Sequence, residues 1–264
     1  MLSLEELKEI SEMPLEDEVS LKTITEFYEK YISNRIYELE LEDETILHFQ
    51  IENRHLPHLL ALNKFLDRKK SHNNFRLNSS KQLTKDIGFN NLKNGHIKIE
   101  DLKTVNGTTK KYKDYKKRIL YFPFTYQLLR KSVFVSYDIL LAERKTTIKG
   151  NYLFANDVGK NKLHFFFIND SYDHHVETTT VPITFIEENI NDFTYTSKQT
   201  KLKINKIIIK DITTRETLEE YNFVECSESI IRKEGQDILL DSIQPKAIEN
   251  VGQVVEDKTG ILKD

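Results

Sequence analysis

The chain has 264 residues, of which 38% are hydrophobic, 10% aromatic and 31% charged, and this length predicts one or two domains with a buried core. The eight glycines form no G-x-G-x-x-G and no Gly-Lys-Ser/Thr, which excludes a recognisable dinucleotide turn and a Walker A loop. A single cysteine allows no intrachain disulfide, and without a leader or a long apolar run we expect a cytoplasmic protein that does not associate with a membrane.

The net charge of −3 conceals a strong segregation of charge along the chain. Residues 1–30 carry 9 acidic and 3 basic side chains, and residues 211–264 carry 13 acidic and 6 basic ones. Residues 64–131 carry 18 basic and 5 acidic side chains, a net charge of 18 − 5 = +13. Like charges at this density repel one another, so we expect the basic zone to meet an anionic partner.

The first half is predicted to be mostly helical. Ser20 is predicted to cap a helix over about 21–32, and two alternating runs at 36–41 and 45–51 predict a β-hairpin. A further helix is expected from Leu56, with Pro57 in its first turn. Further helices are expected near 80–87 and 99–105 and over about 112–131.

The second half is predicted to be mostly β-structure, with strands at 133–141, 151–155, 163–168, 182–186 and 202–209. We therefore predict an α+β fold in which a helical N-terminal half packs on a mainly antiparallel β-sheet from the second half. The expected segments of this one compact unit are 1–131 (helical, with the hairpin and the basic region), 132–210 (the sheet) and 211–264. The last segment is expected to be acidic and peripheral, and dispensable for folding from about Gln244.

The densest basic stretch, 110–118, is the candidate nucleic-acid interface. Its lysines and arginine would neutralise phosphates, and its tyrosines would stack on bases. The alternative interpretation is a solvated helix face, or contact with the protein's own acidic ends. The candidate binding residues are Lys110, Lys111, Tyr112, Lys113, Tyr115, Lys116, Lys117 and Arg118.

Histidines supply the candidate acid–base chemistry. His55 and His58 share one face at the start of a helix, whose N-terminus lowers an imidazole pKa and favours a neutral general base. The alternative is that His55 caps or packs and that His58 is a core residue. His164 lies on a predicted strand, just after Lys160. No metal-binding motif is present, and we predict neither a metal site nor a cofactor.

RNA cleavage through the 2′-hydroxyl requires a base, an acid and positive charge at the phosphorane. The candidate residues on the predicted helix and neighbouring strands are His58, His164, Lys160, Thr184 and Gln199. The alternative is an ordinary exposed strand face.

Four runs carry a resemblance to a known group: Phe49 to Leu62, Asn151 to Phe154, Leu163 to Ile168 and Pro182 to Ile186. Over roughly residues 25–205 they resemble the phage- and plasmid-associated branch of the barnase–EndoU–colicin E5/D–RelE-like (BECR) nucleases. The resemblance implies helices packed on a four-stranded antiparallel sheet and metal-independent ribonuclease chemistry, and its strongest motif match is at His58.

We therefore predict a metal-independent endoribonuclease of a mobile genetic element, a toxin or defence effector with RNA as its partner and an antitoxin or immunity protein as its inhibitor. Two alternatives remain open. One is a non-catalytic module that binds nucleic acid or protein. The other is an ADP-ribosyltransferase-like enzyme, with Glu187 or Glu188 supplying the acid.

Overall fold

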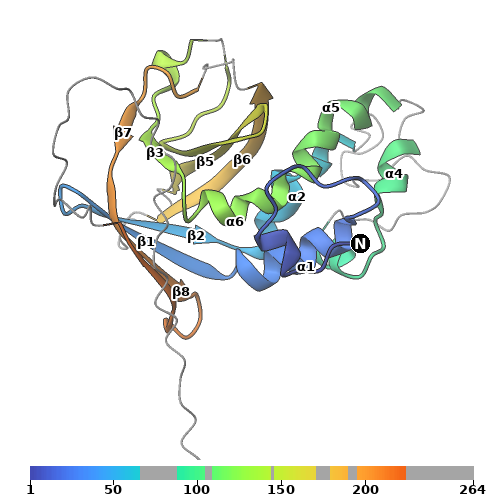
Figure 1. The fold of residues 1–264 in the computed structure, drawn as a ribbon, viewed down its shortest axis with the longest axis horizontal. Coiled ribbons are helices and arrows are strands. Elements are labelled where there is room, and N and C mark those ends of the chain that lie inside the picture. Colours follow the sequence, from blue (N-terminus) through green and yellow to red (C-terminus); the bar gives the residue numbers. More distant parts are fainter. Residues whose placement is uncertain (66–87, 105–108, 144–145, 171–178, 190–194, 224–264) are drawn as a thin grey trace, which may run out of the picture.

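The computed structural model describes residues 1–65, 88–104, 109–143, 146–170, 179–189 and 195–223, with side chains of α5 described from Tyr112 onward. These residues form a curled sheet with strand order β7-β3-β4-β5-β6-β2-β1-β8-β9, and short helices lie beside it (Figure 1). The strands are β1 Arg35–Leu41, β2 Ile46–Ile51, β3 Val133–Ser136, β4 Tyr152–Val158, β5 Asn161–Asp170, β6 Thr179–Asn189, β7 Thr200–Leu202, β8 Ile204–Asp211 and β9 Thr217–Asn222.

Most of the described helices are one or two turns long. Their bounds are η1 Glu6–Lys8, α1 Leu21–Tyr31, η2 Asn53–His55, α2 Leu56–Leu59, η3 Leu62–Phe65, α3 Phe89–Lys93, α4 Ile99–Thr104, α5 Thr109–Leu120, η5 Phe122–Phe124, α6 Thr125–Leu128 and η6 Ile139–Leu141. The start of α1 is as predicted, because the Ser20 side chain accepts a hydrogen bond from the Thr23 N–H at 3.0 Å.

The predicted hairpin is confirmed and forms a central part of the sheet. β1 and β2 pair from Arg35↔Ile51 to Glu40↔Ile46. On the other side of β1, β8 pairs in antiparallel fashion. A two-stranded hairpin is marginally stable alone, so it gains stability by adding partner strands on both sides.

The prediction of a helical N-terminal half packed on a sheet from the second half is wrong. The sheet takes strands from both halves, and the described helices are too short and sparse to form a packed half. The expected long helix over 112–131 ends at Leu120 instead. Pro123 lacks an N–H and cannot extend a helix through its interior, so the chain continues as η5 and α6.

The curl of the sheet follows from one bent segment. Only Lys203 separates β7 from β8, yet β7 pairs with β3 and β8 pairs with β1. This segment therefore joins two distant positions of the strand order. Inside the curve, the Phe49 ring lies edge-on to the rings of Phe134, Phe154 and Phe167, with centroids 5.0 to 5.8 Å apart.

The first residues of the predicted acidic segment belong to the sheet, because β9 pairs with β8. Glu219 on β9 accepts hydrogen bonds from Arg130 Nε and Nη2, both at 2.8 Å, and from Arg35 Nη1 at 2.7 Å. This cluster fastens β9 to β1 and to the end of α6. Residues 224–264, including Gln244, and the helix expected near 80–87 lie outside the described residues.

Candidate functional site

One edge of β6 is covered mostly by helices and has only a short strand partner. In the described part of the chain, β2 pairs with β6 only at His48↔Thr179 and Phe49↔Thr180. Beyond Thr180, α2 and α5 pack against β6 instead of a strand. This edge brings together His58 of α2, Arg118 of α5 and Thr184 of β6, which we call the α2–α5–β6 cluster.

Arg118 is the centre of this cluster. Its Nε donates to the Leu59 carbonyl at 2.7 Å, and its Nη2 donates to Thr184 Oγ1 at 2.9 Å and to the His58 carbonyl at 3.3 Å. Burial lowers the pKa of the Arg118 guanidinium to about 10, so it is still charged at neutral pH. Arg118 is partly buried, and among the described residues no carboxylate forms an ion pair with it.

His58 reaches solvent at the edge of the cluster. The partial burial of its ring lowers the pKa of His58, and the charge of Arg118 lowers it further. A hydrogen bond with the backbone of Ile183 opposes these effects without cancelling them. The imidazole is therefore mainly neutral near pH 7, the state in which a histidine accepts a proton.

A carboxyl and an ammonium group influence one another farther along β6. Burial raises the pKa of Glu187, and the charge of Lys117 partly offsets this rise. Glu187 lies three residues beyond Thr184, about 10 Å along the strand, and its side chain is on the opposite face of the sheet. Glu187 is therefore outside the α2–α5–β6 cluster, and His58 is the titratable group of the cluster whose pKa suits proton transfer near neutral pH.

The fold places the predicted catalytic residues in separate parts of the molecule. His164 is fully buried on β5, with its Nδ1 3.8 Å from Glu188 Oε2 and its ring 5.3 Å from that of Tyr195. It belongs to the second core, on the other face of the sheet from Phe165 and Phe185. Burial on that face makes His164 unsuitable for contact with a polymer bound at His58.

Gln199 and Lys160 are also placed away from the cluster. The Gln199 amide accepts from the Asp138 N–H at 2.8 Å and donates to the Asp138 carbonyl at 3.0 Å, so it fastens the start of β7 to the end of β3. Lys160 is exposed in the turn between β4 and β5. Of the predicted catalytic residues, His58 and Thr184 are brought together.

The side chains of 110–118, the predicted nucleic-acid interface, also lie in different surroundings. Tyr112 is 5% exposed and packs below the Lys103 ammonium, and the Tyr115 ring lies edge-on to that of Phe65 at 5.9 Å. The amphipathic helix α5 turns Tyr112 and part of Tyr115 toward the core, so the Tyr112 ring has little surface left for stacking on a base. Lys113 and Lys117 are exposed, and the side chains of Lys110 and Lys111 lie outside the described residues.

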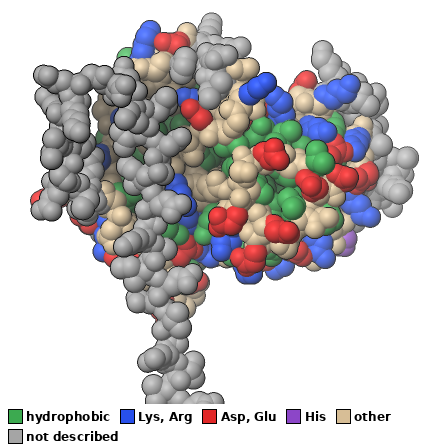
Figure 2. Space-filling view, in the orientation of Figure 1, with side chains coloured by type: hydrophobic (Ala, Val, Ile, Leu, Met, Phe, Trp, Pro, Cys, Tyr) green, Lys and Arg blue, Asp and Glu red, His purple; other side chains and the backbone are tan. Residues whose placement is uncertain are grey.

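The protein's own acidic N-terminal segment neutralises part of the positive charge of the basic zone. Glu16 Oε2 lies 2.8 Å from Lys116 Nζ, and Glu16 also pairs with Lys103. Burial would raise the pKa of Glu16, but these ammonium groups hold it at about 2. Figure 2 shows basic and acidic side chains intermingled on this face, around a group of hydrophobic residues. The alternative interpretation of the basic stretch is thus correct for Lys116.

The contacts of Arg118 were not visible in the sequence. Arg118 was expected at a surface that binds nucleic acid, and it also anchors α2 to β6, which cannot be known without the packing of α5. His55 has the capping role considered for it, since its Nδ1 accepts from the Glu52 N–H at 3.1 Å. His55 is therefore a local structural residue.

Comparison of the chain with protein-family models, with curated proteins and with solved structures finds no match. The resemblance to the BECR nucleases therefore stays a prediction. No helix in the described ranges has both the length and the apolar character needed to cross a bilayer. Among those same residues, no three His, Cys, Asp or Glu side chains are grouped so that they could hold a metal ion.

Proposed function

We propose that the α2–α5–β6 cluster binds a phosphodiester of RNA and that the protein is an endoribonuclease that needs no metal ion. The observation that carries this proposal is Arg118, a partly buried guanidinium with no carboxylate partner among the described residues, beside a histidine of lowered pKa. A guanidinium in such a place is suited to a phosphate, whose charge and geometry it matches.

Each group of the cluster has a role in cleavage by the neighbouring 2′-hydroxyl. His58 takes the proton of that hydroxyl, whose oxygen then attacks phosphorus. Arg118 and Thr184 stabilise the negative charge of the phosphorane. The departing 5′-oxygen takes its proton from water, and the protonated His58 returns its proton to solvent. The products are a 2′,3′-cyclic phosphate and a 5′-hydroxyl.

The direct test uses end-labelled single-stranded RNA in EDTA. We expect cleavage by the parent protein, and a rate lower by roughly 10²- to 10⁴-fold for His58→Ala, the usual effect of removing one acid–base group. The matched control is His96→Ala, since His96 is exposed on the loop between α3 and α4 and lies outside the cluster. RNA with a 2′-deoxy substitution at the cleaved position should be inert.

Uncut RNA, or equal rates for parent and His58→Ala, would contradict the proposal. The second candidate function, a non-catalytic RNA-binding module, would then be preferred. One observation favours it: the burial of His164 leaves the cluster with a single histidine. A module of this kind would bind RNA with an affinity that His58→Ala changes little.

The wider role proposed for the protein is that of a toxin or defence effector of a mobile element, held in check by an antitoxin or immunity protein. This role rests on the sequence resemblance. If it is correct, expression of the parent chain arrests growth of a bacterial host, and His58→Ala relieves the arrest at equal protein level.

A further inference from the structure

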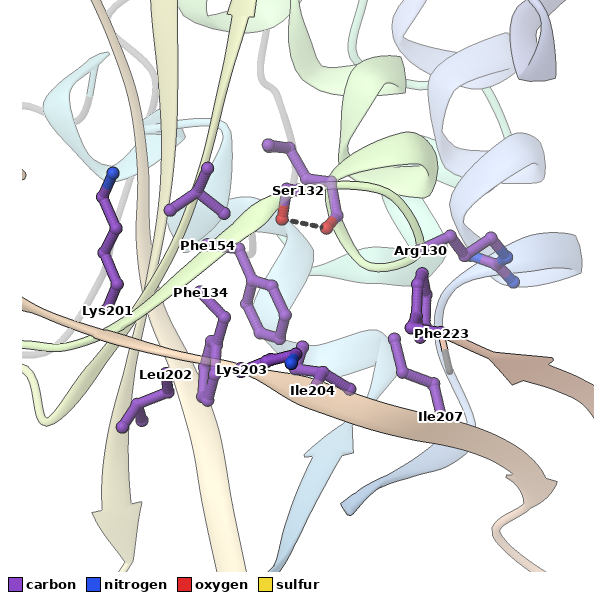
Figure 3. Close-up of a pocket in the computed structure, with 12 residues that line it drawn as sticks. Arg130, Ser132, Phe134, Phe154, Lys201, Leu202, Lys203, Ile204, Ile207 and Phe223 are labelled. Carbon is purple, nitrogen blue, oxygen red and sulfur yellow. Dashed lines mark hydrogen bonds between the residues drawn. The ribbon is translucent and has the colours of Figure 1, made fainter. Parts of the chain in front are cut away.

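β9 stands at one end of the strand order, and among the described residues no strand pairs with its outer edge. The strand is held firmly from its inner side. Phe223, the residue after β9, donates its N–H to the Asn205 carbonyl at 2.8 Å, and its ring packs against the core. Figure 3 shows Phe223 on the same side of the cavity at the β7–β8 bend as Arg130 and Ile207. β9 therefore presents a fixed edge to the outside.

The register of the ladder shows which backbone groups of β9 point outward. In an antiparallel pair, residues that bond to the neighbouring strand alternate with residues whose N–H and C=O point away from it. Phe223 bonds to β8, so in the regular part of the pair Tyr221 and Glu219 also bond to β8. Glu220 and Asn222 therefore direct their backbone N–H and C=O groups toward the outer edge.

This edge lacks the devices that usually keep an exposed strand from pairing with another chain. Proteins place Lys, Pro or unpaired charges on such edges, and β9 contains neither Lys nor Pro. Glu219 is neutralised by Arg130 and Arg35. Glu220 is paired with Lys206 at 2.9 Å. The register shift of the β8–β9 pair lies near the start of β9, and the strand is regular beyond it.

A second copy of the chain fits this edge best when the two copies of Tyr221 lie opposite each other. A two-fold axis perpendicular to the sheet keeps the faces of both strands aligned, so opposite residues differ by an even number of positions. Pairing Glu220 with itself would set like charges opposite each other, which is destabilising. Pairing about Tyr221 sets Glu220 opposite Asn222 of the second copy, so the outward backbone groups of both residues are used.

We propose that two copies of the chain associate through β9, in antiparallel pairing about Tyr221, and join their sheets into one. Backbone bonds of Glu220 and Asn222 give the pairing its direction, and the two Tyr221 rings form a cross-strand aromatic pair. One short strand buries a small area, so we expect a weak dimer with a Kd on the order of 10–100 µM. The proposal does not depend on RNA cleavage, because β9 contributes no residue to the α2–α5–β6 cluster.

The test is sedimentation equilibrium of the full chain over a range of protein concentrations, and we expect a monomer–dimer equilibrium. Glu220→Pro removes an outward N–H and takes no hydrogen bond from β8, a position at which edge strands tolerate proline. It should raise the Kd of the dimer by about tenfold or more, because the bond is lost at both equivalent pairs. The matched control is Glu220→Gln, which keeps the N–H and should dimerise as the parent does.

A second variant tests the register and remains decisive if Glu220→Pro does not fold. Asn222→Glu keeps every backbone group and puts a carboxylate opposite Glu220 at both equivalent pairs, so the Kd should rise by about fivefold. A parent chain that stays monomeric throughout, a dimer that folded Glu220→Pro leaves unchanged, or equal association by Asn222→Glu and the parent would each overturn the proposal.

Discussion

At the scale of single residues, the environment of a side chain decides whether it can act. His58 and His164 have the same chemistry, yet one reaches solvent beside a guanidinium and the other is fully buried. Both were singled out from the sequence, His58 because it shares a face with His55 at the start of a predicted helix, and His164 because it lies on a predicted strand just after Lys160. Their exposure depends on which face of the sheet each residue meets, and strand alternation alone does not say which face is covered.

The lowered pKa of His58 predicts the pH dependence of RNA cleavage. The protonated imidazole cannot accept a proton, so the rate falls as the pH decreases through this pKa. Because burial and Arg118 lower it, the midpoint should lie below the ordinary histidine value of about 6.5. We expect kcat/KM to rise with pH and to reach a plateau near pH 7. In His58→Ala, the fall of kcat/KM at acidic pH should be absent. A midpoint above pH 7 would contradict the assignment.

At the scale of elements, local signals were reliable and long-range pairing was not predicted. Ser20 as a cap, the hairpin and most of the strands follow from local sequence alone. The pairing of β2 with β6, and of β1 with β8, joins residues more than 100 positions apart. No local pattern encodes such partners, so the sheet was expected from the second half only. Likewise, Thr184 was a candidate, but its contact with Arg118 depends on the packing of α5.

Glu219 provides a test of how firmly β9 is held. Burial would raise the pKa of Glu219, but hydrogen bonds and charge from Arg130 hold it at about 2. Because the folded-state pKa is below the ordinary carboxyl value, the stabilisation is present above about pH 4.5 and is lost as the pH falls toward 2. Glu219→Gln leaves the charge of Arg130, which is 2% exposed, without its partner.

We expect Glu219→Gln to lower the free energy of unfolding by about 3–5 kcal/mol at pH 7, measured by urea denaturation. The control is Glu220→Gln on the same strand, an exposed pair with Lys206 whose loss should cost less than about 1 kcal/mol. The difference between parent and Glu219→Gln should shrink between pH 4.5 and pH 2. Equal urea midpoints for the two variants would show that the ion pair does not fasten β9.

At the scale of the whole molecule, the segregation of acidic and basic residues along the chain does not produce separate acidic and basic surfaces. The acidic N-terminal segment folds back on the basic helices, and Glu16 pairs with Lys103 and Lys116. The basic zone is thus partly neutralised from within, which composition alone does not show. Lys113 and Lys117 are exposed, and the charge of Lys117 acts on Glu187 beside the α2–α5–β6 cluster.

This distribution predicts which lysines of α5 bind RNA. A lysine that neutralises a phosphate releases counterions, so removing its charge makes the slope of log affinity against log salt less steep, by about 0.7 per phosphate on single-stranded RNA. We expect the double variant Lys113→Gln/Lys117→Gln to reduce the slope by about 1.4. Lys116→Gln should change the slope less than Lys113→Gln or Lys117→Gln alone, because the Lys116 ammonium already pairs with Glu16 at 2.8 Å. The measurement is fluorescence anisotropy of labelled RNA at several salt concentrations in EDTA, with His58→Ala as the background so that the RNA stays intact. An unchanged slope in the double variant would show that this face of α5 does not meet RNA.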